Sequence, residues 1–271
     1  MKIIQSFKKL LKVFIMNILL IIPVYNERDN IPQLIPAIFQ AAPQAHLLFI
    51  DDNSPDGTGA LIQTYAAADA RVHLLSRPGK MGLGSAYKTG FQMALQQNYE
   101  YIFEMDADFS HDPKYLPDFL NAIEHADLVI GSRYIPGGST PNWTALRRFI
   151  SGGGNIFARF MLGLPSHDCT SGYRCYRRQT LEAVDFANIQ SQGYSFQVEL
   201  VFQTFRKHLR VAEIPIVFMD RRIGQSKMSR GIFIEAFKFV TGAFFKYGRA
   251  PKPRKYLRFS SQGKLVSKPL I

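Results

Sequence analysis

The sequence is poor in cysteine and in long apolar runs, and both absences limit what the protein can be. Among its 271 residues are two cysteines, Cys169 and Cys175, which form neither a disulfide framework nor a closely spaced zinc site. We therefore expect a reduced, cytosol-facing environment. No stretch reaches the roughly 18 apolar residues of a spanning helix. The apolar run at 13–24 leads into a polar loop and favours a buried strand, and we see no small-residue cleavage site of a signal peptide.

Familiar catalytic patterns are also missing. The six histidines have no Ser-His-Asp or paired-His spacing, and the glycine-rich stretch "RPGKMGLGSA" matches neither a P-loop nor GxGxxG. Gly82 and Gly84 in this stretch still allow close approach of the backbone at a helix N-terminus, which favours a site for an anion or a sugar.

Acidic residues are absent from both ends of the chain. Residues 1–16 and 246–271 contain only basic charges, which account for the net charge of +12. A neutral centre with basic ends argues against nucleic-acid binding and favours attraction to an anionic membrane surface. Residues 1–16 also place apolar and lysine side chains on opposite helical faces. Two alternatives are a disordered extension and translation from Met16.

Strands and helices alternate in the first half of the chain. Apolar runs predict strands that end near residues 24, 52, 76, 108 and 134, with helices at 30–42, 59–68, 86–97 and 115–125. Beyond residue 143 the pattern predicts a long helix with three consecutive glycines, a strand at 211–219 and a helix at 231–247. This order predicts an α/β fold with a mostly parallel sheet flanked by helices, in which ligands bind beyond the carboxyl ends of the strands.

We divide the chain into a basic amphipathic extension at 1–16, a catalytic domain at 17–230, an amphipathic helix at 231–247 and a basic tail at 248–271. The helix at 231–247 has one apolar face. That face predicts either docking on the core or an interfacial helix at a membrane. The tail is poor in structure-forming pattern.

Two aspartates end the fourth predicted strand. Strand residues two apart point the same way, so Asp106 and Asp108 would repel each other without a cation between them. Mg²⁺ or Mn²⁺ fits, because such ions take few protein carboxylates and leave room for phosphate oxygens. Ser110 or His111 is a candidate for a further contact. An Asp-x-Asp pair is also common in exposed loops, and its place among other strand-end polar groups favours the metal site.

The other strand ends are polar too. Asp51 and Asp52 lie on opposite faces, so one of them can enter the cleft and accept hydrogen bonds from a base or ribose. Residues 53–57 equally form a good turn, in which Asp56 can cap the next helix. Several cations in nearby loops suit a diphosphate and a second anionic substrate, although each alone could be a surface residue. They are Arg133, Arg147, Arg148, Arg221, Arg222 and Lys227.

Seven segments together carry a family resemblance. They are, in order, "PVYNE", "DDNSPDGT", "GLGSAY", "MDADFSHDP", "GSRY", "DCTSGYRCY" and "DRRIGQSKMS". Over roughly 17–246 the chain resembles the dolichyl- or polyprenyl-phosphate mannosyltransferases, which are family-2 glycosyltransferases of the GT-A type. The resemblance implies a Rossmann-like domain, GDP-mannose as donor, a polyprenyl or dolichyl phosphate as acceptor, and Mg²⁺ or Mn²⁺. It also implies a peripheral enzyme on the cytoplasmic face of a membrane.

The resemblance assigns roles to residues of this chain. The nucleotide sugar would contact Pro23, Tyr25, Glu27, Asp52, Asp56, Gly82 and Gly84. The metal would be held by Asp106, Asp108 and, less certainly matched to the family, Ser110. The catalytic set would be Asp106, Asp108, Arg133 and Arg221. The phosphates and acceptor would contact Arg147, Arg148, Asp168, Ser171, Gly172, Arg174, Ser226 and Lys227.

Charge predicts the mechanism. A phosphate monoester is already anionic, so it can attack the anomeric carbon and invert it with little help from a base, while positioning and charge neutralisation provide the catalysis. The helix at 231–247 would then dock on the core or hold the acceptor's isoprenoid tail. Competing interpretations are a transferase that uses UDP-glucose or another nucleotide sugar, and a non-catalytic module that binds nucleotide sugars.

Overall fold

The computed structural model describes residues 17–189, 191, 193–219, 230–252, 256–261 and 263–266, and the side chains of 230–235 are not part of that description. The predicted N-terminal extension lies outside the described residues. So do three predicted site residues, Arg221, Ser226 and Lys227, and the neighbouring Arg222.

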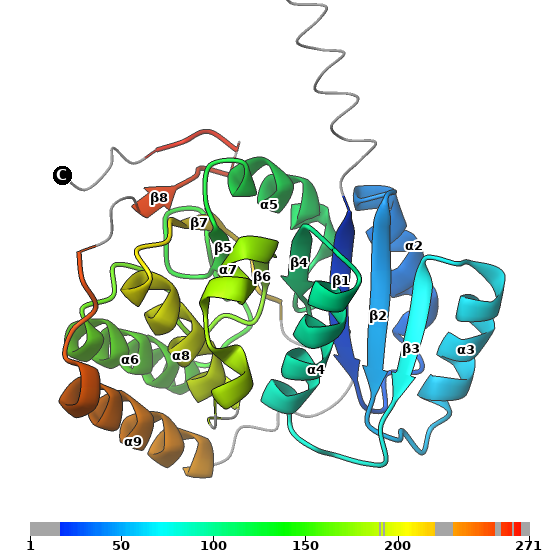
Figure 1. Ribbon diagram of the computed structural model, residues 1–271, viewed down its shortest axis with the longest axis horizontal. Coiled ribbons are helices and arrows are strands. Elements are labelled where there is room, and N and C mark those ends of the chain that lie inside the picture. Colours follow the sequence, from blue (N-terminus) through cyan, green and yellow to red (C-terminus); the bar gives the residue numbers. More distant parts are fainter. Residues whose placement is uncertain are drawn as a thin grey trace, which may run out of the picture.

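A single mixed sheet organises the described part of the chain (Figure 1). Its order is β3-β2-β1-β4-β6-β5-β7-β8, and β6 alone among these strands runs antiparallel to its neighbours. The strands are β1 (Ile18–Val24), β2 (Ala45–Asp51), β3 (Val72–Ser76), β4 (Tyr101–Glu104), β5 (Leu128–Ser132), β6 (Arg174–Arg177), β7 (Val211–Pro215) and β8 (Tyr256–Arg258). The predicted α/β class with a mostly parallel sheet is confirmed.

Helices cover both faces of the sheet. One face packs against α2 (Ile31–Ala41), α3 (Thr58–Ala68) and α5 (Leu116–Ile123), which follows the short helix η1 (Pro113–Tyr115). The other packs against α4 (Leu83–Gln96), α6 (Ala145–Leu162), α7 (Arg178–Ala183), α8 (Gly193–Arg206) and α9 (Arg230–Tyr247), with η2 (Phe186–Asn188) beside them. Because both faces are covered, the central strands are almost wholly apolar.

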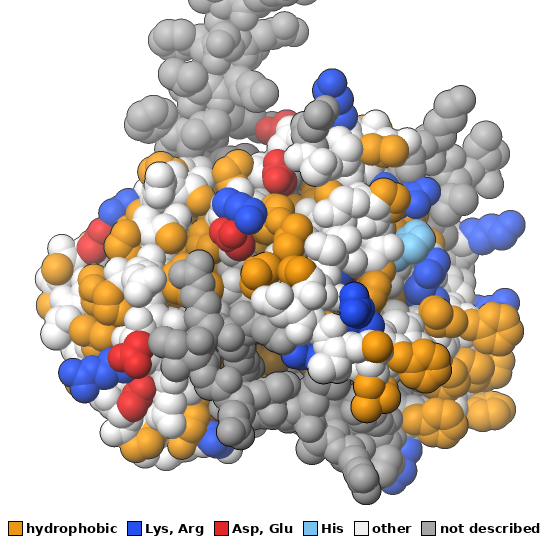
Figure 2. Space-filling view, turned by 180° about the vertical axis from the view of Figure 1, so that it is seen from behind, with side chains coloured by type: hydrophobic (Ala, Val, Ile, Leu, Met, Phe, Trp, Pro, Cys, Tyr) orange, Lys and Arg blue, Asp and Glu red, His pale blue; other side chains and the backbone are white. Residues whose placement is uncertain are grey.

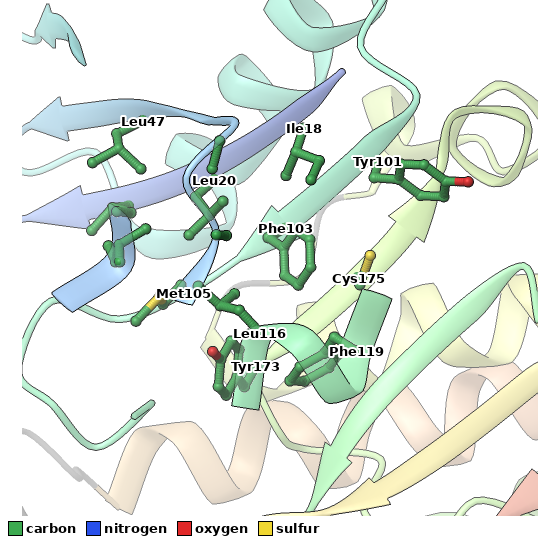
Figure 3. Close-up of a cluster of buried hydrophobic side chains, with 14 of the residues drawn as sticks. Ile18, Leu20, Leu47, Tyr101, Phe103, Met105, Leu116, Phe119, Tyr173 and Cys175 are labelled. Carbon is green, nitrogen blue, oxygen red and sulfur yellow. The ribbon is translucent and has the colours of Figure 1, made fainter. Parts of the chain in front are cut away.

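Alternation along β1 divides the core in two. Leu20 points to the side of α2 and α5, and Ile21 points to the side of α4 and α8. Figure 3 shows the first of these clusters, in which Phe103 of β4 meets Phe119 of α5 edge-on, with ring centroids 5.6 Å apart. Burying each such ring contributes roughly 1.5–3 kcal/mol.

Helix α4 approaches the sheet unusually closely. A Cβ added at Gly90 would lie 2.6 Å from Cγ2 of Ile21, so only glycine permits this contact. The close packing fixes the start of α4, and with it the glycine-rich loop at Gly82, next to the carboxyl end of β1.

The chain departs from the predicted elements in three places. Strand β4 ends at Glu104 rather than near residue 108, because its pairing with β6 ends there and the chain then turns through Phe109, whose φ is +61°. Strand β6 and helix α8 were not predicted. The predicted basic tail is partly ordered, since Tyr256–Arg258 form β8, parallel to β7, with Leu257 fully buried.

Helix α9 docks on the rest of the protein through part of its surface. Val240 and Ala243 are buried against α6 and α8, as the docked interpretation predicts, whereas Phe237 and Phe245 are exposed. Ile232 and Phe233, which the sequence places on the same apolar face, have side chains outside the description. No helix within the described ranges has the length and apolar character needed to cross a membrane.

Candidate active site

A cavity of about 440 Å³ lies at the carboxyl ends of the central strands. The loops after β1, β2, β3, β4 and β5 all contribute to it, together with residues 170–172 and the start of α8. Three of these loops turn through a left-handed residue, namely Asn26, Asn53 and Phe109. Sharp turns at neighbouring strand ends bring groups that are far apart in sequence into one site.

One end of the cavity contains an ion pair and a cation stacked on an aromatic ring. Arg77 donates from Nε to Oδ1 of Asp52 at 2.6 Å, and Nζ of Lys80 lies 3.7 Å from the centre of the Tyr25 ring. Asp51 instead turns away and accepts hydrogen bonds from Ser54. Of Asp51 and Asp52, it is therefore Asp52 that enters the cavity. The strand geometry predicts that only one of the two can do so.

Asp106 and Asp108 both line the middle of the cavity. Their environments differ, because 35% of the Asp106 side chain is exposed whereas Asp108 is 3% exposed. Oδ1 of Asp108 accepts hydrogen bonds from the backbone N and the hydroxyl of Ser110, the latter at 2.6 Å. The sequence predicts that Asp106 and Asp108 lie together because alternate strand residues point the same way. Both residues instead lie in the turn after β4, and this turn brings them together.

His111 stabilises the turn that contains Asp106 and Asp108. Its Nδ1 accepts a hydrogen bond from the backbone N of Asp106 at 2.9 Å, and its ring stacks on Tyr173. Burial lowers the pKa of His111, against the attraction of Asp106 and Asp108. The neutral ring with Nδ1 as acceptor therefore orders the turn that contains Asp106 and Asp108. This position makes His111 unsuitable as a metal ligand through Nδ1.

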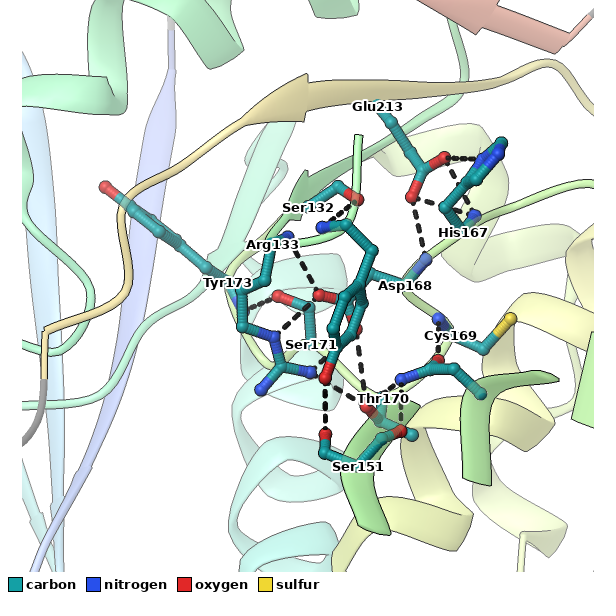
Figure 4. A network of polar contacts seen from close by, with 12 residues as sticks. Ser132, Arg133, Ser151, His167, Asp168, Cys169, Thr170, Ser171, Tyr173 and Glu213 are labelled. Atoms are coloured by element: carbon teal, nitrogen blue, oxygen red, sulfur yellow. Dashed lines mark hydrogen bonds and ion pairs between the residues drawn. The ribbon is translucent and has the colours of Figure 1, made fainter. Parts of the chain in front are cut away.

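Arg133 and Asp168 form a buried ion pair with two hydrogen bonds. Nε of Arg133 lies 2.7 Å from Oδ2 of Asp168, and Nη2 lies 2.7 Å from Oδ1. Nη2 also donates to the hydroxyl of Thr170. Burial alone would raise the pKa of Asp168, but the charge and hydrogen bonds of Arg133 hold it below its usual value. Arg133 faces the cavity, and Asp168 lies behind it (Figure 4).

A second buried carboxylate supports this pair. Glu213 of β7 accepts hydrogen bonds from the backbone N of His167 and of Asp168, and from the hydroxyl of Tyr256 in β8. Figure 4 shows Glu213 bonded to the segment at His167 and Asp168. Through Tyr256, Glu213 also connects β8 to this segment.

Trp143 brings two arginines together at the far end of the cavity. The guanidinium carbon of Arg147 lies 4.2 Å from the centre of a Trp143 ring, and that of Arg133 lies 5.3 Å away. Stacking on a tryptophan holds a guanidinium in place while its N–H edges remain able to bind anions. This end of the cavity is therefore suited to a phosphate group.

A second cavity, of about 490 Å³, adjoins this end between α6 and α9. Trp143, Thr170 and Tyr194 line both cavities. Apart from those three, its lining is almost entirely apolar or glycine. The remaining lining residues are Ile150, Ser151, Gly153, Gly154, Phe157, Ala158, Val198, Ala236, Phe237 and Val240. A polar cavity and an apolar cavity thus share three lining residues.

Most of the predicted site residues in the described ranges meet in the first cavity. The lining includes Pro23, Tyr25, Glu27, Asp52, Gly82, Asp106, Asp108, Ser110, Arg133, Arg147, Ser171 and Gly172. Five others do not line it: Asp56, Gly84, Arg148, Asp168 and Arg174.

Their positions explain why these five residues do not line the cavity. Asp56 accepts hydrogen bonds from Thr58 at the start of α3, Gly84 is buried within α4, and Arg148 is exposed. Arg174 is fully buried and donates to the backbone oxygens of Ser171, Gln197 and Cys169. For Asp56, Gly84 and Arg174 the geometry indicates a structural role, and direct contact with a ligand in this cavity is not supported.

Sequence reasoning missed several contributors. Arg77, Lys80, Trp143, Tyr194 and Gln197 all line the cavity, and Glu213 supports it. Arg77 and Lys80 lie in the glycine-rich loop after a predicted strand, which is a usable signal. The contributions of Glu213 and Gln197 depend on contacts between distant segments, which the sequence pattern does not reveal.

These features define a GT-A-type glycosyltransferase. Residues 19–185 match the family described as "Glycosyl transferase family 2", so the chain belongs to that family and is a glycosyltransferase. It is 49% identical over 226 residues to an undecaprenyl-phosphate mannosyltransferase of Micrococcus luteus, covering 83% of this chain and 93% of the relative. It is 45% identical over 242 residues to a polyprenol monophosphomannose synthase of Mycolicibacterium smegmatis, covering 89% and 91%. The predicted family resemblance is confirmed.

Solved structures share the fold at low sequence identity. Glucosyl-3-phosphoglycerate synthase from Mycobacterium tuberculosis superimposes with a TM-score of 0.59 at 18% identity, covering 94% of this chain and 87% of the other. The mannosyltransferase PcManGT from Pyrobaculum calidifontis, solved with GDP-Man and Mn²⁺, gives 0.52 at 14%, covering 87% and 66%. These similarities support the GT-A fold.

Proposed function

We propose that the protein transfers mannose from GDP-mannose to a polyprenyl phosphate at a membrane surface, with inversion at the anomeric carbon. The observation that carries this proposal is the junction of two cavities at Trp143. There, beside two arginines, a charged cavity with an aspartate pair adjoins an apolar one. A nucleotide sugar fits the first cavity and an isoprenoid phosphate fits the junction and the second. The activities named for the two bacterial relatives agree with this assignment.

The nucleotide would occupy the end formed by Tyr25, Asp52 and the glycine-rich loop. The Asp52 carboxylate can accept hydrogen bonds from the base or ribose. Lys80 lies over Tyr25 at the cavity wall and offers a positive charge to the diphosphate. This arrangement orients the sugar toward the middle of the cavity.

Asp106 and Asp108 are the residues that would hold Mg²⁺ or Mn²⁺. Two carboxylates in a cavity with room for a diphosphate match the usual donor set of these ions, which take one or two protein carboxylates plus substrate phosphates. No cluster of three or more potential ligand side chains occurs in the described ranges, which fits an ion completed by substrate. When bound, the metal would neutralise charge that develops on the leaving diphosphate.

The reaction itself needs positioning more than acid–base chemistry. An oxygen of the acceptor phosphate forms a bond to the anomeric carbon while the bond from that carbon to the GDP oxygen breaks, and GDP leaves. The acceptor oxygen is already anionic, so no side chain has to remove a proton. Arg133 and Arg147 would hold the acceptor phosphate at Trp143, and this alignment provides much of the rate enhancement.

The apolar cavity would hold the first isoprene units of the acceptor. It lies directly beside the two arginines and is bounded by α6 and α9. Gly153 and Gly154 form part of its wall, and a Cβ added at either would meet nothing within 4 Å. A chain anchored by its phosphate at Trp143 can therefore run along α6 toward the outer surface.

The outer face of α6 suits a membrane surface. Leu146, Phe149, Ile156 and Phe160 recur at helical spacing and are exposed, and Phe237 and Phe245 of α9 are exposed as well. Figure 2 shows hydrophobic side chains gathered at the lower right of the molecule. Exposed basic residues of the same two helices and the turn after them, including Arg148, Lys238, Lys246 and Arg249, could contact anionic lipid headgroups. We propose peripheral attachment through this face.

A transfer assay tests the proposal. The purified chain would be incubated with Mn²⁺, a short polyprenyl phosphate and either GDP-mannose or UDP-glucose. We expect mannosyl lipid from GDP-mannose and no product from UDP-glucose. Product from UDP-glucose alone would keep the fold and site but overturn the assigned donor. Absence of product with both donors would favour a module that binds nucleotide sugars without transferring them.

A further inference from the structure

A group of buried polar atoms beneath the aspartate turn has no role in the mechanism above. It comprises Glu104 at the end of β4, Tyr87 of α4 and Gln197 of α8, all of them almost completely buried. Within the described part of the chain, both Glu104 oxygens, the Tyr87 hydroxyl and both amide atoms of Gln197 lack a well-directed hydrogen-bond partner. Buried polar atoms are normally paired, so this concentration next to a cavity needs an explanation.

Gln197 is the member of this group that reaches the cavity. It lines the cavity although only 2% of the residue is exposed, and its backbone oxygen is fixed by a 2.9 Å hydrogen bond from Arg174. A Cβ added at Gly172 would lie 3.9 Å from its Nε2. The glycine therefore leaves space in front of the amide, and the cavity is open to a ligand at that point.

The surroundings of the amide favour a neutral ligand group. The carboxyl group of Glu104 lies behind the amide, and the positive charge of Arg174 acts on that carboxyl group more strongly than the amide does. The guanidinium groups that suit a phosphate are stacked on Trp143, whereas the group that reaches the cavity here is a neutral amide. A hydroxyl group both donates and accepts hydrogen bonds, as a glutamine amide does. A nucleotide sugar offers neutral hydroxyl groups on its ribose and on its transferred sugar. The ribose is assigned to Asp52 at the other end of the cavity, so the hydroxyl groups left for Gln197 are those of the transferred sugar.

We propose that the side-chain amide of Gln197 binds a hydroxyl group of the transferred sugar and contributes to selection of the donor. This inference rests on the proposed function, because it places the sugar between the aspartate pair and the start of α8. Arg174 acts behind it as a positioning residue, since it holds the backbone of both Gln197 and Ser171.

Calorimetry with the full chain and Mn²⁺ separates sugar binding from nucleotide binding. Gln197→Met keeps the size of the side chain and removes its hydrogen bonds. We expect it to weaken GDP-mannose binding about two- to tenfold, as the loss of one hydrogen bond predicts, and to leave GDP binding unchanged. Gln203→Met is the matched control on the same helix, because Gln203 bonds to Asp185 and Glu199 and does not line the cavity. It should change neither affinity.

A series of GDP-mannose analogues, each lacking one hydroxyl group, identifies the contact. One analogue should bind the wild type more weakly than GDP-mannose does, yet bind Gln197→Met as well as GDP-mannose does. Equal GDP-mannose affinity in wild type and Gln197→Met would overturn the inference. An equal loss of GDP and GDP-mannose binding would also overturn it, by indicating a structural role.

Failure of the proposed function gives a different result. In that case the wild type itself would not bind GDP-mannose more tightly than another nucleotide sugar. The comparison is then made between the nucleotide sugar that does bind and its own nucleotide diphosphate. Gln197→Met must still lower the affinity for that nucleotide sugar and leave the affinity for the nucleotide diphosphate unchanged. If neither affinity changes, a contact between Gln197 and the sugar is refuted.

Discussion

The guanidinium of Arg133 and the carboxylate of Asp168 form a two-bonded ion pair that is almost completely buried at the edge of the active site. Asp168 determines which edge of Arg133 can face a ligand, because Nε and Nη2 already point at the carboxylate. The pair thus acts as a fixed unit. Its orientation depends further on Glu213 and, through it, on Tyr256 in the C-terminal strand.

Removing the negative charge of this pair should destabilise the protein strongly. Asp168→Asn leaves a buried guanidinium without its counter-charge, and we expect a loss of about 3–5 kcal/mol in the free energy of unfolding. Urea denaturation measures it. Asp127→Asn is the matched control, because Asp127 also forms two hydrogen bonds with an arginine, but that Arg210 is 40% exposed and can be solvated. A loss in Asp168→Asn no larger than in the control would contradict the importance of burial.

Neutralising one aspartate of the predicted metal pair should abolish transfer without unfolding the chain. Asp108→Asn removes a charge that would hold the cation, and we expect at least a roughly 100-fold fall in kcat with Mn²⁺ present. Asp112→Asn alters an acid in the same loop that pairs with the exposed Lys114 and should keep its activity. Titration of Mn²⁺ by electron paramagnetic resonance gives an independent readout. Unchanged Mn²⁺ affinity in Asp108→Asn would remove the metal assignment.

Much of the fold could be predicted because its signals are local. The strands β1 and β2 are apolar runs followed by turn residues, and Asp52, Asp106 and Arg133 follow strand ends that meet at one edge of the sheet. The position of β6 in the sheet could not be predicted, since Arg174–Arg177 is a short strand that inserts between β4 and β5. Its position depends on tertiary pairing, which overrides local pattern.

Two basic segments lie in surroundings that their charge did not predict. Arg174 looked like a ligand-binding cation, but its charge is buried on backbone oxygens. The segment after residue 248 looked like a tail because of its basic charge, but Tyr256 and Leu257 fill the edge of the sheet. Charge in a sequence does not indicate whether a side chain is solvated. Two backbone partners of Arg174 lie three and five residues away, whereas β8 pairs with the distant strand β7.

Acidification should weaken the edge of the sheet through His46. Its Nδ1 lies 3.2 Å from Nε2 of His73 and 3.0 Å from the hydroxyl of Tyr99. Burial, and then the charge of His73, lowers the pKa of His46 below 6.5. A base whose pKa is lowered on folding contributes stability that is present above its unfolded pKa and is lost as pH falls through the folded value.

The melting temperature of the wild type should therefore fall between pH 7.5 and pH 5.5 by more than that of His46→Gln. Titrating groups that do not interact with His46 contribute equally to both proteins and cancel, so the difference measures His46 together with its coupling to His73. Thermal unfolding at both pH values measures the difference. An identical pH dependence in the two proteins would show that His46 does not titrate in this range.

The exposed aromatic residues of α6 should contribute to membrane binding independently of salt. Phe149 and Phe160 are 78% and 70% exposed. Replacing both with serine should lower the fraction that sediments with anionic liposomes at least about tenfold, because each ring contributes apolar burial. High salt screens the attraction of the basic residues to the lipid headgroups but does not weaken the apolar contribution of the two rings.

The matched control replaces Leu265 and Val266, which are also exposed but lie near β8. Leu265→Ser with Val266→Ser should sediment like the wild type. If the α6 variant and this control sediment equally well, the basic ends of the chain would be the better explanation of any attachment.

A larger side chain at Gly154 should block the acceptor while sparing the donor. Gly154 lines the apolar cavity, whereas Gly152 does not, and a Cβ added at either meets nothing within 4 Å. Leucine at either position also replaces a helical glycine, which should stabilise α6 by roughly 0.5–1 kcal/mol. The two variants should therefore fold equally well, and they differ in whether the new side chain enters the cavity.

Steady-state kinetics with acceptors of different length then tests the cavity. Gly154→Leu should raise the KM for a long polyprenyl phosphate about tenfold or more and leave the KM for GDP-mannose unchanged, and Gly152→Leu should resemble the wild type. A water-soluble acceptor too short to reach past Trp143 should be used equally well by all three proteins, since it never enters the space beside α6. Equal kinetics of the two leucine variants with the long acceptor would mean that the isoprenoid chain leaves the active site by another route.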